Sequence, residues 1–279
     1  MITALLDTAA ATLREAGVES PEHDARALAV HLLGLKKPSD LMMVDAIDEP
    51  AYLDLVARRA ERVPLQHLTG SAPFRYVELE VGPGVFVPRP ETEVVVGWAV
   101  DALREVERPL VVDLCTGSGT CALALANEVR GVTVHAVERD PGALAWAARN
   151  TKNRVAEGDP EVHLHEGSVE DALPELDGTV DLVISNPPYV AEGERHLPDP
   201  EVVDHDPEIA LFAGAYGLDV IRLVERTAHR LLKPGGLVVV EHSDRQGRSA
   251  PALFTDGWTD VKDHRDLTGR DRFVTATRS

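Results

Sequence analysis

The chain has 279 residues, of which 44% are hydrophobic, so it is long enough for about two domains and too apolar for intrinsic disorder. Its 28 Lys and Arg residues against 47 Asp and Glu residues give a formal net charge of −19. A dedicated nucleic-acid-binding surface needs clustered basic residues and is therefore not expected. Two cysteines are too few for a disulfide framework, no apolar run is long enough to span a membrane, and no signal peptide is apparent. We expect a cytoplasmic protein.

Residues 1–70 are predicted to form a small helical domain. Apolar residues recur at helical spacing over 2–13, and a second helix is expected after the N-cap candidate Ser20. Pro38 and Asp48 each open a further short helix. The segment holds no cluster of catalytic type, so we assign it to substrate recognition.

Residues 71–90 are predicted to form a β-hairpin linker. Residues 74–81 alternate between apolar and polar side chains, as a half-buried strand does. Residues 82–84 are Gly-Pro-Gly, which predicts a turn there. We expect the returning strand at residues 85–87.

Residues 91–279 alternate between helices and short apolar strands. The predicted helices are 93–106, 120–129, 141–150 and 218–232, and the predicted strands are 110–113, 133–137, 162–165, 180–185, 237–241, 258–264 and 272–277. This alternation predicts an α/β fold of Rossmann-like type, with a parallel sheet covered on both faces. The last two strands are expected to add an antiparallel edge.

A glycine-rich loop follows the first of these strands. Asp113, Thr116, Gly117 and Gly119 lie where the chain turns from strand to helix, and glycine permits a sharp turn and the close approach of a ligand. The next strand ends at Glu138, whose carboxylate can accept hydrogen bonds from both hydroxyls of a ribose. An ordinary structural turn is the alternative for the loop, because this pattern is weak by itself.

The segment Asn186-Pro187-Pro188-Tyr189 directly follows the strand 180–185. Ligands of open α/β sheets bind at the carboxyl ends of the strands, so the segment should face the same crevice as the glycine loop. The Asn186 side-chain oxygen and the Pro187 carbonyl can both accept hydrogen bonds, and the prolines hold the backbone fixed. Tyr189 offers a flat face for stacking. Two acceptors and a ring are suited to an amino group on a planar system.

This segment resembles the signature of S-adenosylmethionine-dependent methyltransferases that act on planar amino or amide nitrogens. A second segment, Pro88-Arg89-Pro90-Glu91-Thr92-Glu93, resembles the one that marks the release factor glutamine methyltransferases, and residues 64–70 and 207–219 are also similar to that family. The resemblance runs from about residue 60 onward. It implies a class I methyltransferase domain over 91–279 and a class I peptide chain release factor as the protein substrate.

The resemblance also implies roles for particular residues. S-adenosylmethionine, which leaves as S-adenosylhomocysteine, would be bound by Asp113, Thr116, Gly117, Gly119, Glu138, Ser168, Val169 and Asn186. The substrate glutamine would be contacted by Asn186, Pro187, Pro188, Tyr189, Arg89 and Glu91, with Asn186, Pro187 and Tyr189 as the catalytic residues. No metal, nucleic acid or membrane is implied, and a monomer is expected.

Two positions depart from the family pattern. Cys115 stands where many members have glycine, and Ser168 stands where an acid is usual near the adenine. The roles of Arg89 and Glu91 stay open, because they can pair with each other as ions or line the donor pocket.

The remaining polar residues of note are two histidines and an aspartate, and two other functions are alternatives. His163 and His165 share one face of a strand but lack further ligands at metal spacing, and Asp206 is expected in a surface loop. The alternative functions are a nucleic-acid amino-methyltransferase, which the net charge disfavours, and a non-catalytic binding protein.

Overall fold

The computed structural model describes residues 2–197 and 199–279, which belong to two compact units. The first unit contains the chain up to residue 71 together with residues 199–205, and the second contains the remainder. The sequence division into 1–70, 71–90 and 91–279 did not include the segment 199–205 in the helical part.

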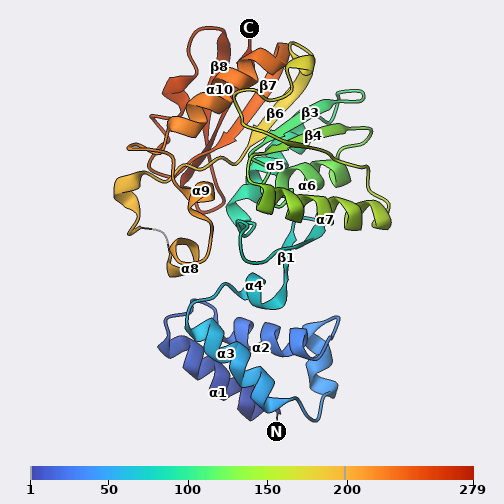
Figure 1. Ribbon diagram of the computed structural model, residues 1–279, viewed down its shortest axis with the longest axis vertical. Helices are drawn as coiled ribbons and strands as arrows, with labels where there is room; N and C mark the ends of the chain where they lie inside the picture. Colours follow the sequence, from blue (N-terminus) through green and yellow to red (C-terminus); the bar gives the residue numbers. More distant parts are fainter. Residues whose placement is uncertain (1, 198) are drawn as a thin grey trace. The chain divides into compact units, whose positions relative to one another are not determined.

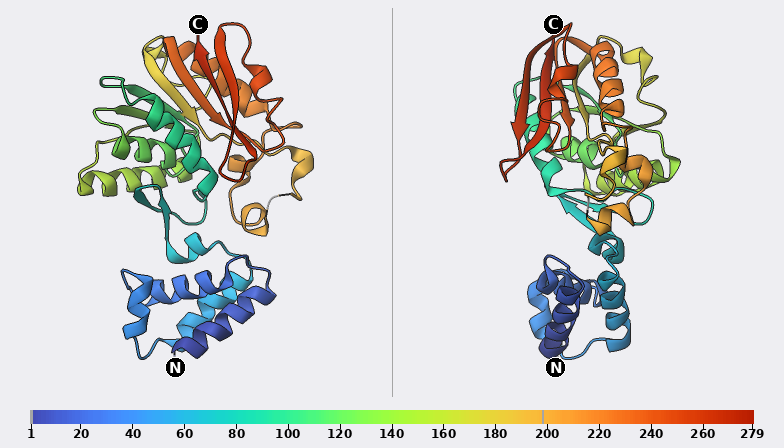
Figure 2. Two further views of the ribbon diagram at one scale, coloured as in Figure 1. Left: turned by 180° about the vertical axis from the view of Figure 1, so that it is seen from behind. Right: turned by 90° about the vertical axis from the view of Figure 1, so that its left-hand side faces the viewer.

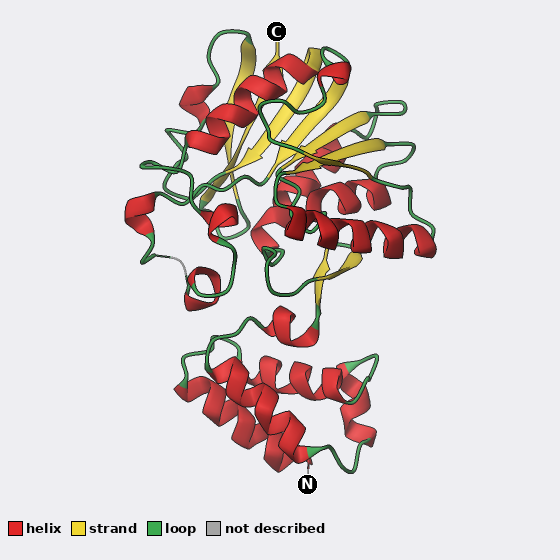
Figure 3. Ribbon diagram, in the orientation of Figure 1, coloured by secondary structure: helices red, strands yellow, loops and turns green. Residues whose placement is uncertain are grey.

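The first unit is built from helices, as Figure 3 shows. These are α1 (Ile2–Glu15), α2 (Pro21–Leu32), the 3₁₀ helix η1 (Pro38–Met43), α3 (Glu49–Ala60), α4 (Leu65–Thr69) and α8 (Pro200–Val203). Asp48 caps α3 by accepting a 3.2 Å bond from the Ala51 amide, whereas the side chain of Ser20 makes no capping bond to α2. Helix α2 begins at proline, which has no amide hydrogen to satisfy.

Charge also stabilises this helical unit internally. Arg59 donates to Asp24 at 2.8 Å and to Glu201 of α8 at 2.9 Å, and the three side chains are largely buried. Tyr52 is fully buried, and its hydroxyl donates to the Ala25 carbonyl at 2.9 Å. Every buried polar group named here is therefore paired, as burial requires.

The second unit opens with a two-stranded sheet whose turn differs from the prediction. Strands β1 (Ser71–Phe74) and β2 (Val77–Glu80) are joined at Arg75, and residues 85–87 form no strand. The prediction that the hairpin turns at residues 82–84 was therefore wrong. Arg75 adopts a φ of 50° and its guanidinium makes two bonds to Glu128, at 2.5 and 2.6 Å, which anchor the turn at this position.

A seven-stranded sheet forms the centre of the second unit (Figure 1). Its strands are β3 (Leu110–Leu114), β4 (Thr133–Glu138), β5 (His163–Glu166), β6 (Val180–Ser185), β7 (Leu232–Glu241), β8 (Trp258–Arg265) and β9 (Asp271–Arg278). The order is β5-β4-β3-β6-β7-β9-β8, with β9 antiparallel to both of its neighbours and the remaining pairs parallel. The predicted α/β fold and its antiparallel edge are confirmed. The strand order reverses between β3 and β6, which is where open sheets of this kind bind ligands.

Helices cover both faces of this sheet, as the two views of Figure 2 show. The main ones are α5 (Pro90–Ala102), α6 (Thr120–Glu128), α7 (Pro141–Glu157) and α10 (Asp219–Leu231), and the short ones are η2 (Pro174–Leu176), η3 (Glu192–Glu194), α9 (Glu208–Leu211) and η4 (Pro251–Leu253). Apolar residues of α5 and α6 pack with one face of the sheet, and those of α10 pack with the other. Among the described residues, no helix has the length and apolar character needed to cross a bilayer.

Candidate active site

Asp113, at the end of β3, is the most buried carboxylate of the glycine-rich loop. Its Oδ2 accepts from the Thr116 hydroxyl at 2.6 Å and from the Ala122 amide at 3.1 Å. Its Oδ1 is buried and has no hydrogen-bond partner among the described atoms. Burial raises the pKa of Asp113 to about 7. An unpaired buried oxygen is costly, so this atom is suited to a cationic ligand group such as an ammonium.

The backbone of the loop takes the left-handed conformation three times. Gly117 and Gly119 have φ values of 59° and 88°, and Cys115 has a φ of 63°. A Cβ on Gly117 would meet no atom within 4 Å, so this side of the loop is open, whereas one on Gly119 would lie 2.9 Å from Leu123. Cys115 thus adopts the conformation that favours glycine, at a cost of about 1–2 kcal/mol.

Glu138 connects the loops that follow three neighbouring strands. Its Oε2 accepts from the Gly117 amide and its Oε1 from the Asp140 amide, both at 2.9 Å. Its backbone carbonyl accepts from Gly167, after β5, at 3.0 Å. Each carboxylate oxygen retains a further lone pair, and the residue is buried, with 8% of its surface exposed. The residue can therefore bind two hydroxyl groups without losing its backbone contacts.

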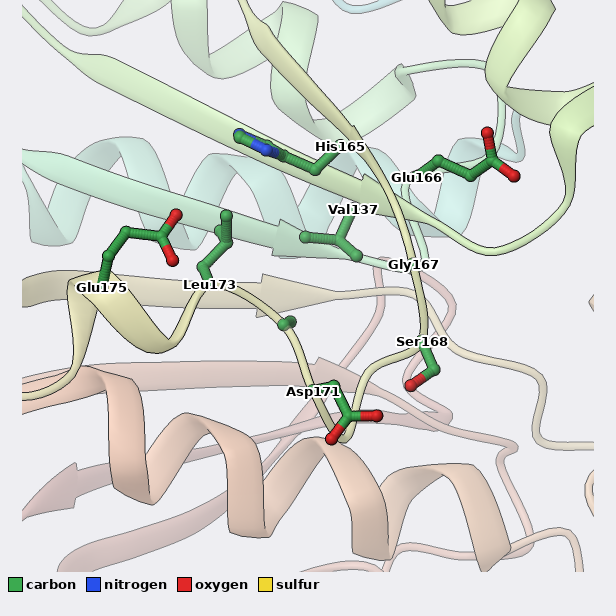
Figure 4. A pocket seen from close by; sticks show the side chains of 9 residues that line it. Val137, His165, Glu166, Gly167, Ser168, Asp171, Leu173 and Glu175 are labelled. Atoms are coloured by element: carbon green, nitrogen blue, oxygen red, sulfur yellow. The ribbon is translucent and has the colours of Figure 1, made fainter.

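A cavity of about 350 Å³ lies at the ends of β4 and β5. Figure 4 shows Ser168 and Asp171 on the loop that lines it, with Val137 and Glu175 also in the lining. Val169 is buried beside this loop, and its carbonyl accepts from the Thr227 hydroxyl at 2.9 Å. Ser168 therefore lines the cavity with its side chain, whereas Val169 could hydrogen-bond a ligand only through its backbone.

The proline-containing segment begins at the end of β6, next to β3. The Asn186 amide nitrogen Nδ2 donates to the Thr92 hydroxyl at 3.1 Å. The Tyr189 hydroxyl donates to Glu241 Oε1 at 3.2 Å, and burial raises the pKa of this hydroxyl. Pro187 is buried. The structure brings Asn186 together with Thr92 and Glu241, which the sequence reasoning had not selected as site residues.

Gln246 holds the far end of this segment. Its Nε2 lies within hydrogen-bond distance of the carbonyls of Tyr189 (3.1 Å), Tyr216 (3.1 Å) and Gly217 (3.2 Å), which share its two hydrogens. Its Oε1 accepts from the Ser243 amide at 3.0 Å. A Cβ on Gly217 would lie 2.1 Å from the Tyr189 oxygen, so only glycine fits here. Gln246 had no signal in the sequence, because its three acceptors are all backbone atoms.

Arg89 pairs with Asp206 and not with Glu91. Its Nη2 lies 2.9 Å from Asp206 Oδ2, and its guanidinium lies 5.3 Å from the centre of the Phe86 ring. The Asp206 side chain has no exposed surface, so the expectation of a surface loop at this residue was wrong. The buried Asp206 side chain also accepts a 3.4 Å bond from the Val87 amide. Substrate contact by Arg89 or Glu91 stays a prediction.

The histidines on β5 have a partner that the sequence did not indicate. His135 on β4 lies opposite them, with its Nδ1 2.9 Å from His165 Nε2 and its ring centre 4.9 Å from that of His163. Burial lowers the pKa of both His135 and His165. Within the described part of the chain, no group of His, Cys, Asp and Glu residues has an arrangement that could hold a metal ion.

Comparison with known proteins identifies the class to which this fold and site belong. Residues 109–267 match a family model described as a methyltransferase domain. A solved 16S rRNA N2 methyltransferase of Thermus thermophilus, in complex with AdoMet and guanosine, has a TM-score of 0.54 at 20% identity and covers 75% of this chain and 50% of its own. This likeness concerns the fold alone. The second unit is therefore a class I methyltransferase domain.

Relatives over the whole length define the family. Residues 4–70 match the model of the PrmC N-terminal domain. The release factor glutamine methyltransferase of Streptomyces coelicolor is 55% identical and covers 99% of this chain and 98% of its own length. That of Mycolicibacterium smegmatis is 50% identical, with coverages of 98% and 96%. The chain belongs to the release factor glutamine methyltransferases, and the resemblance read from its motifs is confirmed.

Proposed function

We propose that this protein transfers a methyl group from S-adenosylmethionine to the side-chain amide nitrogen of the glutamine in the Gly-Gly-Gln motif of class I release factors. The observation that carries the proposal is the arrangement of Asn186: its nitrogen is bound by Thr92, so its oxygen stays available as an acceptor at the switch point of the sheet. The names of the relatives support the same substrate. A cytoplasmic location and a monomeric state belong to this proposal.

The residues of the donor side fit S-adenosylmethionine. The unpaired Oδ1 of Asp113 suits its ammonium group, and the two oxygens of Glu138 suit the ribose hydroxyls. Thr116, Gly117 and Gly119 shape the loop, and Ser168 with the backbone of Val169 is the proposed contact of the adenine. When bound, S-adenosylmethionine supplies an electrophilic methyl group.

The acceptor side has to make a poor nucleophile react. An amide nitrogen is weakly nucleophilic because its lone pair is delocalised into the carbonyl. The Asn186 oxygen and the Pro187 carbonyl can accept its two hydrogens, which orients the lone pair and stabilises the positive charge that develops on the nitrogen. Such positioning is worth about 7–11 kcal/mol at its best. Because the proton can leave after methyl transfer, no strong base is required beside Asn186, and Pro188 and Tyr189 complete the surface for the planar amide.

Mass spectrometry after incubation with S-adenosylmethionine tests the proposal. A class I release factor should gain the mass of one methylene on its Gly-Gly-Gln peptide, and a release factor with that glutamine changed to alanine should gain none. The same incubation with RNA and DNA should leave them unlabelled. Label that enters nucleic acid and not the release factor would establish the alternative function of a nucleic-acid amino-methyltransferase.

A further inference from the structure

Four side chains behind the acceptor site form one continuous chain of hydrogen bonds. Asn186 Nδ2 donates to Thr92 Oγ1 at 3.1 Å, and Thr92 Oγ1 lies 2.7 Å from Glu241 Oε2. The Tyr189 hydroxyl lies 3.2 Å from the other oxygen of Glu241. Both Thr92 and Glu241 are 1% exposed, so water does not compete for these bonds.

The protonation of Glu241 decides the direction of every bond in this chain. An ionised carboxylate has only acceptors, so the hydroxyls of Thr92 and Tyr189 must both donate to it. The Thr92 oxygen is then left with lone pairs only, and it can bind Asn186 only by accepting from the Nδ2 group. The Asn186 amide is thereby held in one of its two flipped orientations, with Oδ1 turned to the acceptor site. A protonated Glu241 can donate to Thr92, which frees the threonine proton for Asn186 Oδ1 and permits the other orientation.

We propose that Glu241 is a positioning residue for methyl transfer, which acts through Thr92 to fix the Asn186 side chain with its oxygen toward the glutamine amide. The effect of this positioning on the rate of methyl transfer rests on the proposed function. The orientation of Asn186 itself is a property of the chain and can be observed without any substrate.

The charged groups around Glu241 set the pH at which the chain operates. Burial raises the pKa of Glu241 to about 7, and the charge of Glu91 on α5 acts in the same direction. Arg272 on β9 and the hydroxyls of Thr92 and Tyr189 act against it. The Cys121 thiol on α6, whose pKa Glu241 helps to raise, is a further titratable group near it. The rate of methyl transfer should therefore fall as the pH is lowered through about 7.

Steady-state kinetics of matched variants test the effect on rate. Glu241→Gln and Thr92→Val should each lower kcat about 10- to 100-fold, the range expected for losing a hydrogen bond to a charged group, with little change in KM for either substrate. Thr92→Ser, which keeps the hydroxyl, should recover most of that loss, and the double variant should be no worse than either single one. Thr151→Val is the control, because the Thr151 hydroxyl is also buried but has no partner among the described atoms. Wild-type kcat in Thr92→Val, or additive losses in the double variant, would refute the inference.

Nuclear magnetic resonance of the protein without substrate supplies a readout independent of activity. The side-chain amide signal of Asn186, identified by its loss in Asn186→Ala, should shift with a midpoint near pH 7 in the wild type and stay constant in Glu241→Gln. If this shift is seen but no release factor is methylated, the proposed function fails and the positioning inference stands. If the wild type methylates release factor and the signal does not respond to pH, the positioning inference fails and the proposed function stands.

Discussion

The two halves of the candidate site are held in place by different parts of the chain. In the donor half, the side chain of Glu138 accepts backbone amides of Gly117 and Asp140, so local main chain fixes the geometry. In the acceptor half, Asn186 is fixed by side chains alone, first Thr92 and through it Glu241. Each half also contains one buried carboxyl whose pKa is raised to about 7, Asp113 in the donor half and Glu241 in the acceptor half. Substitutions at Thr92 or Glu241 should therefore change the position of Asn186 and leave the backbone contacts of Glu138 intact.

The largest effect is expected from removing the acceptor oxygen. Asn186→Ala should lower methyl transfer about 100- to 1,000-fold, because a preorganised group that stabilises developing charge is lost. The affinity for S-adenosylmethionine, measured by calorimetry, should stay close to that of the wild type. Full activity of this variant would contradict the division of the site into two independent halves.

Each half contains one buried carboxyl with a raised pKa. The two carboxyls can therefore be compared by how much each makes the free energy of unfolding depend on pH. Burial raises the pKa of Glu241 from 4.5 to about 7 and that of Asp113 from 3.8 to about 7. Between the ordinary and the raised pKa values, the folded state binds more protons than the unfolded state. The stabilisation that the two protonated carboxyls contribute is therefore complete below pH 4 and is lost as the pH rises through about 7. The free energy of unfolding, measured by urea titration without donor, should fall over this range. Glu241→Gln should reduce that fall by up to about 3 kcal/mol, and Asp113→Asn by up to about 4 kcal/mol.

Changing Glu138 should weaken donor binding and also remove one of the contacts that its side chain makes with the amides of Gly117 and Asp140. Glu138→Gln keeps the shape but replaces one acceptor oxygen with a donor, which should weaken S-adenosylmethionine binding about 10- to 100-fold. Glu161→Gln, at an exposed position before β5, is the control and should bind as the wild type does. An unchanged Kd for Glu138→Gln would show that the ribose is not bound here.

The smallest effect concerns the backbone of the donor half. Cys115 has a φ of 63°, which glycine adopts without penalty, so Cys115→Gly should raise the free energy of unfolding by about 1 kcal/mol. The same change at Cys121, in the helix α6, should lower it by about 1 kcal/mol, because glycine destabilises helix interiors. Urea titration of both variants checks this difference. Changes of the same sign in the free energy of unfolding of the two variants would contradict it.

The sequence predicted the donor half more completely than the acceptor half. The strand β3, the glycine loop and the strand end at Glu138 were all found, because each rests on a local pattern of apolar residues and glycines. Asn186 was also found, but its supports were not: Thr92 lies 94 positions away along the chain and Glu241 lies 149 positions from Thr92. No spacing rule relates such residues, since only the order of strands in the sheet brings them together. The roles assigned to the individual site residues stay predictions.

The hairpin shows a second limit of local patterns. Gly-Pro-Gly at 82–84 is a strong turn signal, yet the strands turn at Arg75, which has a left-handed backbone and whose guanidinium pairs with the distant Glu128. Similarly, Asp206 is expected in a surface loop, yet its side chain is buried and pairs with Arg89. Local chemistry predicted the elements, and distant partners decided these details.

The position of β9 has a consequence for how the protein matures during its own synthesis. This strand inserts between β7 and β8, with Phe273 opposite Glu241. The ribosome makes β9 after β7, so a nascent chain that already contains β3 to β7 has β7 as an open sheet edge. Such an edge is prone to pair with other chains, and its exposure ends only when β9 emerges. The strands that carry both halves of the candidate site, β3 to β7, are thus all made before β9 covers the edge at β7.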